Sequence, residues 1–321
     1  CADVTGVQTC ALPILKILLA TDGSESARAA VDCLLRFPFP RNSEVTLLTV
    51  IDRNVFKNEE VSSINEEQRD ELEETEKIVQ LAAQKLLAEE ATRLTGAGWS
   101  ESRELRIGHP AEEIVSLAEQ LDSDCIIVGS HGTSGIRRFL LGSVSDYVLQ
   151  YAPCSVLIVK KDDIQRAETG KPLRLLLSYD DSPSAMKAVE FCASLPMDEQ
   201  AEVTVLTVLP LVKMYRQDIR QRLSWLWLEK KKQALAALER VKEEIGLTTK
   251  HVETQLRESP DVSDEILQAA TELDSDLIVL GHKGKGAIKK FLLGSVTTRI
   301  AHHAPCSVLA VRKSQNLTTG C

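Results

Sequence analysis

The sequence predicts two α/β domains in tandem, each a doubly wound, five-stranded parallel sheet with helices on both faces. The chain has 321 residues, which is about twice the common length of one domain. Two segments recur with an offset of 152: FLLGSV at 139–144 and 291–296, and APCSVL at 152–157 and 304–309. Within each copy, short apolar runs alternate with longer amphipathic stretches, as strands and helices do in a parallel α/β sheet.

The two copies and the polar stretch between them set the expected domain bounds. Domain 1 is expected at 15–161 and domain 2 at 173–313, with the polar segment 162–172 as a linker and 314–321 as a tail. Residues 1–14 are expected to be a non-native leader, since the chain starts with Cys1 and VTGVQTCALPI resembles translated sequencing-adapter read-through.

The expected strands are the apolar runs, because strands covered on both faces are apolar throughout. They are 15–20, 45–51, 102–107, 125–128 and 155–159 in the first copy, and 173–177, 203–209, 251–256, 277–280 and 307–311 in the second.

Composition excludes several classes of protein. Apolar residues make up 43% of the chain and charged residues 26%, which excludes disordered and fibrous proteins. The net charge of -9 opposes binding to nucleic acid or to an anionic membrane. The sequence has no apolar run of transmembrane length, so we expect a cytoplasmic protein. The six cysteines beyond the leader form no CxxC pairs, which favours reduced, mostly buried thiols.

A glycine-rich pattern, G-x2-G-x9-G-S, follows the fourth expected strand of each copy. Glycines let backbone amides approach an anion, and the final Gly-Ser opens a helix whose first N–H groups attract phosphate. The alternative is an ordinary strand-to-helix turn that ends in a serine N-cap. Arg137 and Arg138, or Lys289 and Lys290 in the second copy, could add positive charge or point to solvent. The pattern residues are Gly129, Gly132, Gly142 and Ser143 in the first copy, and Gly281, Gly284, Gly294 and Ser295 in the second.

One acidic residue follows the first expected strand of each copy. Asp22 in ATDGSES matches Asp180 in SYDDSPS, with an offset of 158. A carboxylate at this place could hold a ribose hydroxyl or a Mg²⁺ ion bound to phosphate. The alternative is the N-cap of the helix that follows.

Together these motifs resemble the universal stress protein family, and the resemblance covers both halves of the chain from about Lys16 to Lys313. It implies a Rossmann-like fold of the adenine nucleotide alpha hydrolase type that binds ATP, with Mg²⁺ as a companion ion. By the resemblance, Asp22 borders the ribose and the metal-phosphate end, and Val50 presents its backbone to adenine. Gly129, Gly132, Gly142 and Ser143 would hold ribose and phosphates. In the second copy the same roles fall on Asp180, Val208, Gly281, Gly284, Gly294 and Ser295.

The resemblance also implies how the two copies associate. In single-domain relatives the last strand pairs two protomers, so we expect segments 155–160 and 307–313 to pair within one chain. Whether two such chains form a homodimer stays open.

The second copy departs from the pattern in two places. Gly108 becomes Glu258 or Ser259, depending on the alignment, and Asp181 stands where the first copy has Gly23. An acidic side chain near the phosphates would repel them, so the second site is the less certain one.

Several other features have both an ordinary and a functional interpretation. His302 and His303 favour a helix end over a metal site, and His131 and His282 either contact a nucleotide or face solvent. Segment 59–76 holds nine acidic residues and one basic, and segment 213–232 holds seven basic and two acidic. Such runs usually form solvated helix faces, but opposite charges could also dock the two copies, or two chains. Trp225 and Trp227 in the basic segment mark either a partner surface or a packing contact.

We therefore expect an ATP-binding, stress-response module that acts in signalling or regulation rather than as an enzyme. The glycine loop has no paired carboxylates, activated nucleophile or Walker lysine-serine motif beside it. One alternative is a nucleotide-free interaction module, in which the loop is only a turn. The other is an enzyme that hydrolyses ATP slowly or transfers a nucleotidyl group.

Overall fold

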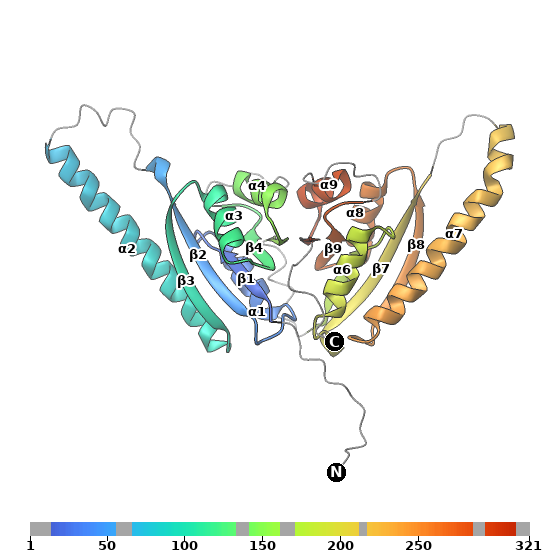
Figure 1. Cartoon of the computed structure of the whole chain (residues 1–321), viewed down its shortest axis with the longest axis horizontal. Coiled ribbons are helices and arrows are strands. Elements are labelled where there is room, and N and C mark those ends of the chain that lie inside the picture. The colour runs from blue at the N-terminus through green and yellow to red at the C-terminus, as the bar shows by residue number, and fades with distance from the viewer. Residues whose placement is uncertain are drawn as a thin grey trace, which may run out of the picture.

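The computed structural model describes residues 14–55, 66–132, 141–160, 171–211, 217–284 and 293–312. Ten strands form one continuous sheet in the order β3-β2-β1-β4-β5-β10-β9-β6-β7-β8 (Figure 1). Neighbouring strands run parallel within each copy, as predicted. The strands of the first copy are β1 (Lys16–Ala20), β2 (Glu44–Asp52), β3 (Ser100–Gly108), β4 (Cys125–Gly129) and β5 (Ser155–Val159). Those of the second are β6 (Leu173–Ser178), β7 (Ala201–Pro210), β8 (Val252–Ser259), β9 (Leu277–Gly281) and β10 (Ser307–Val311).

Helices cover both faces of the sheet. On one face, α1 (Glu25–Arg36), α2 (Glu66–Gly96), α6 (Pro183–Ala193) and α7 (Gln217–Ile245) share a single apolar core that runs across both copies. The Phe39 and Phe191 rings, 6.5 Å apart, lie within that shared core. On the other face, α3 (Pro110–Gln120) and α4 (Ser143–Tyr151) cover the first copy, and α8 (Val262–Glu272) and α9 (Ser295–His303) cover the second. Two short 3-10 turns, η1 (Arg53–Val55) and η4 (Asp198–Gln200), complete the described elements.

The two copies meet at an antiparallel pair, β5 with β10. Leu157 and Leu309 lie opposite each other at its centre, and both are fully buried. The pairing is extended at both ends: Ser155 exchanges hydrogen bonds with the backbone of Arg312, and Ser307 Oγ accepts from Lys160 N at 3.1 Å. The copies therefore share a sheet as well as an apolar core.

Basic side chains at the end of each last strand also bind the other copy. Arg312 donates to the carbonyl oxygens of Leu149 and Gln150, at the C-terminal end of α4. The Lys160 ammonium donates to the Ala304 carbonyl at the end of α9. Positive charge is favourable at helix C-termini, so both contacts stabilise the junction between the copies. The sequence analysis did not single out Lys160 or Arg312, although their matched positions, 152 residues apart, could have revealed them.

The expectation that every strand is apolar on both faces is wrong for the two outermost strands. β3 and β8 are mostly exposed or half-buried, whereas β5 and β10 are buried throughout. They lie at the two edges of the sheet, where α2 and α7 cover one face more fully than the shorter α3 and α8 cover the other (Figure 1). The structure also lengthens several predicted strands by one to three residues.

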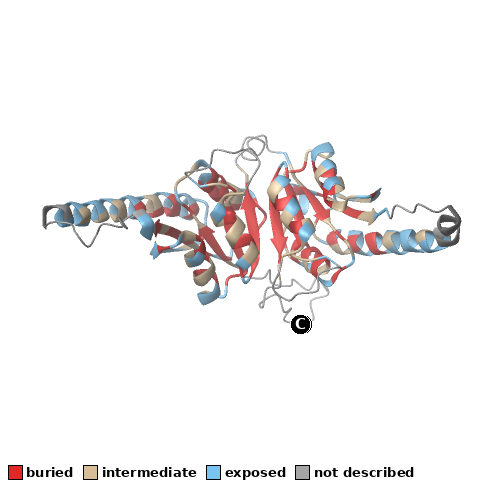
Figure 2. Ribbon diagram, turned by 90° about the horizontal axis from the view of Figure 1, so that it is seen from above, coloured by how far each residue is buried: buried red, intermediate tan, exposed pale blue. Residues whose placement is uncertain are grey.

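The acidic and basic charge runs do not dock the two copies against each other. Helix α2 lies at one end of the molecule and α7 at the other, beyond the edge strands (Figure 1). Figure 2 shows that buried residues gather around the sheet, whereas the outer parts of these two long helices are largely exposed. The prediction of solvated helix faces is therefore confirmed for the described parts of α2 and α7, and the interpretation as docking within one chain is wrong.

The structure also shows how far the cysteines and the two tryptophans of α7 are buried. Cys125, Cys154, Cys192 and Cys306 are free, buried thiols and Cys33 is a free, half-buried one, as predicted. The side chain of Trp225 is 66% exposed, whereas Trp227 is half-buried.

In the part of the chain that the structure describes, no helix is both long enough and apolar enough to span a bilayer.

Candidate functional site

The candidate site lies at the carboxyl edge of the sheet, where β1 and β4 end side by side. The chain leaves β1 toward β2 on one side, and β4 lies on the other side, so this is the point at which strand order reverses. Doubly wound sheets bind ligands at such switch points. β6 has the same position between β7 and β9 in the second copy.

The acidic residue after the first strand lies against the glycine loop in both copies. A Cβ atom added to Gly132 would lie 2.8 Å from Asp22 Oδ2, and one added to Gly284 would lie 2.9 Å from Asp180 Oδ2. The other carboxylate oxygen, Oδ1, accepts from a backbone N–H two residues on, at 3.0 Å in each copy. The structure thus brings the aspartate and the second glycine of the pattern together.

The interpretation of Asp22 and Asp180 as helix N-caps is wrong. Ser24 caps α1 and Ser182 caps α6, each accepting a hydrogen bond from the N–H three residues further along. The aspartates stand two residues earlier, where their carboxylates orient the chain that enters each helix.

The first glycine of each pattern has a packing role. A Cβ on Gly129 would lie 2.6 Å from the backbone carbon of Ser26, and a Cβ on Gly281 would lie 2.5 Å from that of Ser184. Only glycine lets the ends of β4 and β9 approach the first turns of α1 and α6 this closely. These two glycines therefore fix the starting point of each loop.

The last Gly-Ser of each pattern forms the start of a helix, with glycine rather than serine as the N-cap. Gly142 is the N-cap of α4 and Gly294 that of α9, so Ser143 and Ser295 are the first helical residues, and both are exposed. The serine N-cap that the alternative interpretation assumed is therefore wrong. A glycine has no side chain to accept from the first-turn amides, so these N–H groups can face an anion.

Both glycine loops are closed by backbone hydrogen bonds. Gly142 N donates to Ser130 O at 2.9 Å, and Gly294 N donates to His282 O at 2.8 Å. The fourth strand and the following helix are therefore tied together at the base of each loop. The middle of each loop, including Arg137, Arg138, Lys289 and Lys290, lies outside the described residues.

Val50 and Val208 lie just beyond the end of the neighbouring first strand. Leu48 O accepts from Thr21 N, so the backbone groups of Leu48 point toward β1. Alternate residues of a parallel strand bond to the same neighbouring strand, so the backbone groups of Val50, two residues later, also point toward β1. Because β1 ends at Ala20, the backbone of Val50 extends past the last β1–β2 pair. Val208 is placed in the same way, two residues after Leu206.

Two threonines that the sequence analysis missed hold this geometry. Thr49 Oγ1 donates to Thr21 O at 3.0 Å, and Thr207 Oγ1 donates to Tyr179 O at 2.8 Å. Each hydroxyl fixes the turn that leads to the aspartate. Their positions match with the same 158-residue offset as the aspartates, and that offset is the signal that could have identified them.

The second copy differs from the first near the aspartate. Asp181 has φ +57°, a left-handed conformation like that of Gly23 at +74°. Its Oδ1 accepts from the Tyr179 hydroxyl at 3.1 Å, so its side chain is turned toward that ring. Burial, together with this bond to a carboxylate, raises the pKa of Tyr179 to about 12.

The strand pairing also shows which residue of the second copy corresponds to Gly108. Gly108 lies opposite Asp52 at the end of β3, and Ser259 lies opposite Pro210 at the end of β8, so Ser259 is the counterpart of Gly108. Glu258 forms an ion pair with Lys231 of α7 at 3.0 Å. Its charge is thereby directed toward α7, which removes one reason to doubt the second site.

The loop histidines differ between the copies. His282 Nδ1 lies 2.8 Å from Ser184 Oγ, a contact to α6, and the residue is half-buried. Burial, with the nearby charges of Arg312 and Lys283, lowers the pKa of His282 to about 4. His131 Nδ1 lies 3.1 Å from Ser130 Oγ, and its Nε2 is buried with no hydrogen-bond partner among the described residues.

His302 and His303 form the last turn of α9, as predicted. His302 Nε2 lies 3.0 Å from Asp146 Oδ1 of the other copy. Within the described residues, no group of three or more His, Cys, Asp and Glu side chains is arranged to hold a metal ion. A metal at the glycine loop would therefore need ligands supplied by a nucleotide or by water.

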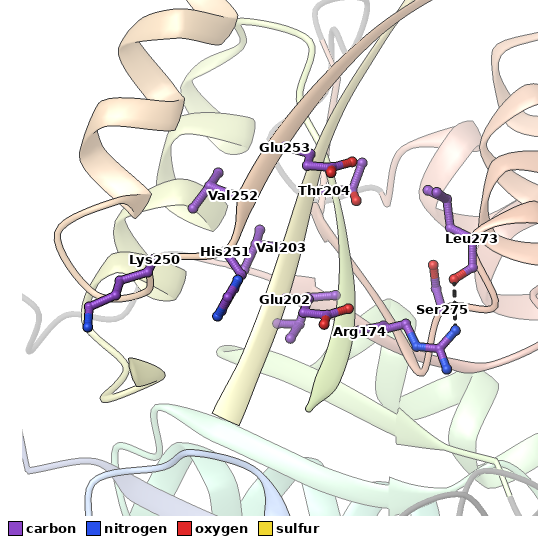
Figure 3. Close-up of a pocket in the computed structure, with 11 residues that line it drawn as sticks. Arg174, Glu202, Val203, Thr204, Lys250, His251, Val252, Glu253, Leu273 and Ser275 are labelled. Carbon is purple, nitrogen blue, oxygen red and sulfur yellow. Dashed lines mark hydrogen bonds between the residues drawn. The ribbon is translucent and has the colours of Figure 1, made fainter. Parts of the chain in front are cut away.

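A separate cavity of about 420 Å³ lies at the opposite edge of the sheet, beside the beginnings of β6, β7 and β8 (Figure 3). Its lining includes Arg174, Glu202, Lys250 and His251. Arg174 donates to the Leu273 carbonyl across one side of it. This cavity is far along the strands from the carboxyl edge and does not belong to the candidate site.

Comparisons with known proteins agree with this architecture. The model of the Universal stress protein family matches residues 13–160 and 173–312. A universal stress protein of Methanocaldococcus jannaschii is 34% identical over 156 residues, covering 46% of this chain and 94% of that protein. A relative from Staphylococcus haemolyticus is 33% identical over 151 residues, covering 46% of this chain and 86% of that protein.

A solved structure matches the tandem arrangement. The crystal structure of a universal stress protein from Archaeoglobus fulgidus covers 94% of this chain and 97% of its own, with a TM-score of 0.59. At 23% identity this likeness shows the fold alone. Two Rossmann-like domains in one chain, each matched by the family model, identify this protein as a tandem, two-domain member of the universal stress protein family.

Proposed function

We propose that this protein binds ATP with Mg²⁺ at the carboxyl edge of the first copy and acts as a regulatory module of the stress response. The observation that carries the proposal is the close approach of Gly132 to Asp22, 2.8 Å from a would-be Cβ to Oδ2, beside the glycine-capped start of α4. A backbone without a Cβ, a helix N-terminus and one carboxylate are what a metal-bound phosphate needs.

The residues of the first copy fit this ligand. The first-turn amides of α4, at Ser143 and beyond, would bind phosphate oxygens, and Asp22 would bind the ribose or the Mg²⁺ ion. The backbone of Val50, which extends past the end of β1, would receive the adenine edge. His131 Nε2, buried without a partner among the described residues, is a further polar atom at the loop that a ligand could satisfy.

The second copy is proposed as the weaker site. It keeps the approach of Gly284 to Asp180, and its Glu258 is paired with Lys231. However, Asp181 adds a second carboxylate beside Asp180, and like charges weaken the binding of phosphate. The described surroundings of Asp180 thus favour the nucleotide less than those of Asp22.

The proposed role is binding and signalling rather than rapid turnover. Each copy combines the three glycines and one serine of the pattern with the aspartate after its first strand, a set that can hold phosphates and a metal ion. Mg²⁺, when bound, would neutralise phosphate charge and order the ligand against Asp22.

A thermal unfolding series tests the proposal. Because ATP would bind only the folded state, it should raise the free energy of unfolding by about 2.7 kcal/mol at a hundredfold excess over Kd. For a chain of 321 residues that corresponds to a rise of about 4 °C in Tm. The Asp22→Asn variant should lose most of the additional shift that Mg²⁺ gives over EDTA, whereas Asp180→Asn should keep it. An unchanged Tm at millimolar ATP with Mg²⁺ would refute nucleotide binding.

A further inference from the structure

The outer parts of α2 and α7 expose apolar side chains that do not contribute to the core. On α2, Ile78 is 60% exposed and Leu81 is 65% exposed. On α7, Trp225 and Leu228 are each 66% exposed and Leu235 is 48% exposed. Exposed apolar side chains that gather on one helix face mark contact surfaces.

These residues lie on the helix faces opposite the core. The core-facing residues of α7 include Ala237, Leu238 and Val241, all buried. Positions 225, 228 and 235, spaced by three and seven residues, fall on the other side of the helix, and position 232 continues that stripe. On α2, positions 78 and 81 lie opposite the buried Ala83 and Leu87.

The two stripes have the same spacing and complementary chemistry. The outward stripe of α2 is Glu71, Glu74, Ile78 and Leu81, and that of α7 is Trp225, Leu228, Lys232 and Leu235. All three charged residues are exposed. If the helices run antiparallel, Glu74 meets Lys232, Ile78 meets Leu228 and Leu81 meets Trp225. Glu71 then lies against Leu235, the one mismatched pair of this arrangement. The parallel arrangement pairs Leu81 with Leu235 but places Glu71 against Trp225, Glu74 against Leu228 and Ile78 against Lys232, which gives three mismatched pairs.

The two stripes cannot contact each other within one chain, because α2 and α7 stand at its opposite ends (Figure 1). We infer that α2 of one chain packs antiparallel against α7 of a second copy. Each chain offers both surfaces, so the contact is heterologous, and successive chains join head to tail into a ring or an open filament. The acidic and basic runs of the sequence would then serve association between chains.

Charge reversal on each stripe gives a sharp test by sedimentation velocity of the full chain between about 1 and 200 μM, at low and high salt. The wild type should associate, and more weakly at high salt. Glu74→Lys alone and Lys232→Glu alone should each weaken association by about fivefold to tenfold, since each replaces an attractive pair with a repulsive one. An equimolar mixture of the two variants should associate like the wild type, because every contact in the mixed assembly again pairs opposite charges.

Two further variants separate this contact from other causes. Trp225→Ser combined with Leu228→Ser should abolish association at these concentrations, because it removes the apolar centre of the α7 stripe. Lys250→Glu makes the same charge change outside both stripes, at an exposed side chain that pairs with Glu199 at 3.8 Å, and it should leave association unchanged. All variants should keep the wild-type Tm, since the altered side chains are exposed. A wild type that stays monomeric throughout, or a mixture that fails to restore association, would overturn the inference.

Discussion

Adding one methyl group to Gly132, the second glycine of the first loop, should weaken nucleotide binding much more than it lowers the free energy of unfolding. In Gly132→Ala the new Cβ would lie 2.8 Å from Asp22 Oδ2, whereas ordinary contacts begin at 3.4 Å. The Asp22 carboxylate must therefore move by about 0.6 Å, the difference between these two distances. Because the obstructing atom is the end of a side chain, the free energy of unfolding should fall by no more than about 1 kcal/mol.

The effect on binding should be larger than the effect on folding. Moving Asp22 breaks its alignment with the ligand, and losing one charge-assisted interaction of about 1.5–3 kcal/mol weakens binding by about tenfold to a hundredfold. Isothermal titration of ATP with Mg²⁺ into the wild type and the variant measures this ratio. Gly96→Ala is the matched control, since a Cβ there meets no atom within 4 Å. Equal affinity of Gly132→Ala and the wild type would refute the assignment of Asp22 and Gly132 to the site.

Three further predictions concern stability. Ser24→Ala and Ser182→Ala remove the caps of α1 and α6, and each should lower the free energy of unfolding in urea by about 1 kcal/mol. Arg312→Ala leaves two carbonyl groups at the end of α4 without their donor and should cost about 1–3 kcal/mol in the same assay, a loss that Arg312→Lys should reduce only in part. His282 has a folded-state pKa of about 4, below its ordinary 6.5, so the folded state binds fewer protons than the unfolded state. The stability it contributes is complete above pH 6.5 and falls as the pH drops toward 4. Thermal melts across that range should show a smaller loss for His282→Ser, and an equal loss would contradict the assignment.

The sequence predicted the sheet correctly because its central strands have a strong and repeated signal. The runs at 125–128 and 277–280 are apolar on both faces, and the structure buries nearly every residue there. The edge strands were harder to predict, because a strand covered fully on only one face tolerates polar side chains. β3 contains Glu104 and Arg106, and the alternation alone did not reveal which strands lie at the edges.

The candidate site was predictable in its residues but not in its contacts. Repetition of the glycine pattern identified Gly132 and Gly284, whereas their approach to Asp22 and Asp180 depends on the order β2-β1-β4, a tertiary feature. The helix caps were misassigned for a local reason. Asp22 and Ser24 are both good cap residues two positions apart, and only the backbone geometry shows that Ser24 accepts the capping bond.

The hypothesis that opposite charges dock the two copies within one chain was wrong, because a sequence pattern does not show how far apart two segments lie in the fold. Acidic and basic runs occupy matching places in the two copies, after the second strand of each. The antiparallel β5–β10 junction turns the copies so that these matching helices point away from each other (Figure 1). The same symmetry leaves both surfaces accessible to other molecules.

The most direct test of the central claim, that the first copy is the nucleotide site, is the nucleotide content of the protein itself. Protein purified without added nucleotide is denatured, and any released small molecule is identified and counted by mass spectrometry, for the wild type and for Gly132→Val and Gly284→Val. We predict that the wild type releases adenine nucleotide at about one per chain, that Gly132→Val releases none, and that Gly284→Val releases nearly the wild-type amount. Release that Gly132→Val leaves unchanged, or no release together with no rise in Tm at millimolar ATP and Mg²⁺, would contradict the claim.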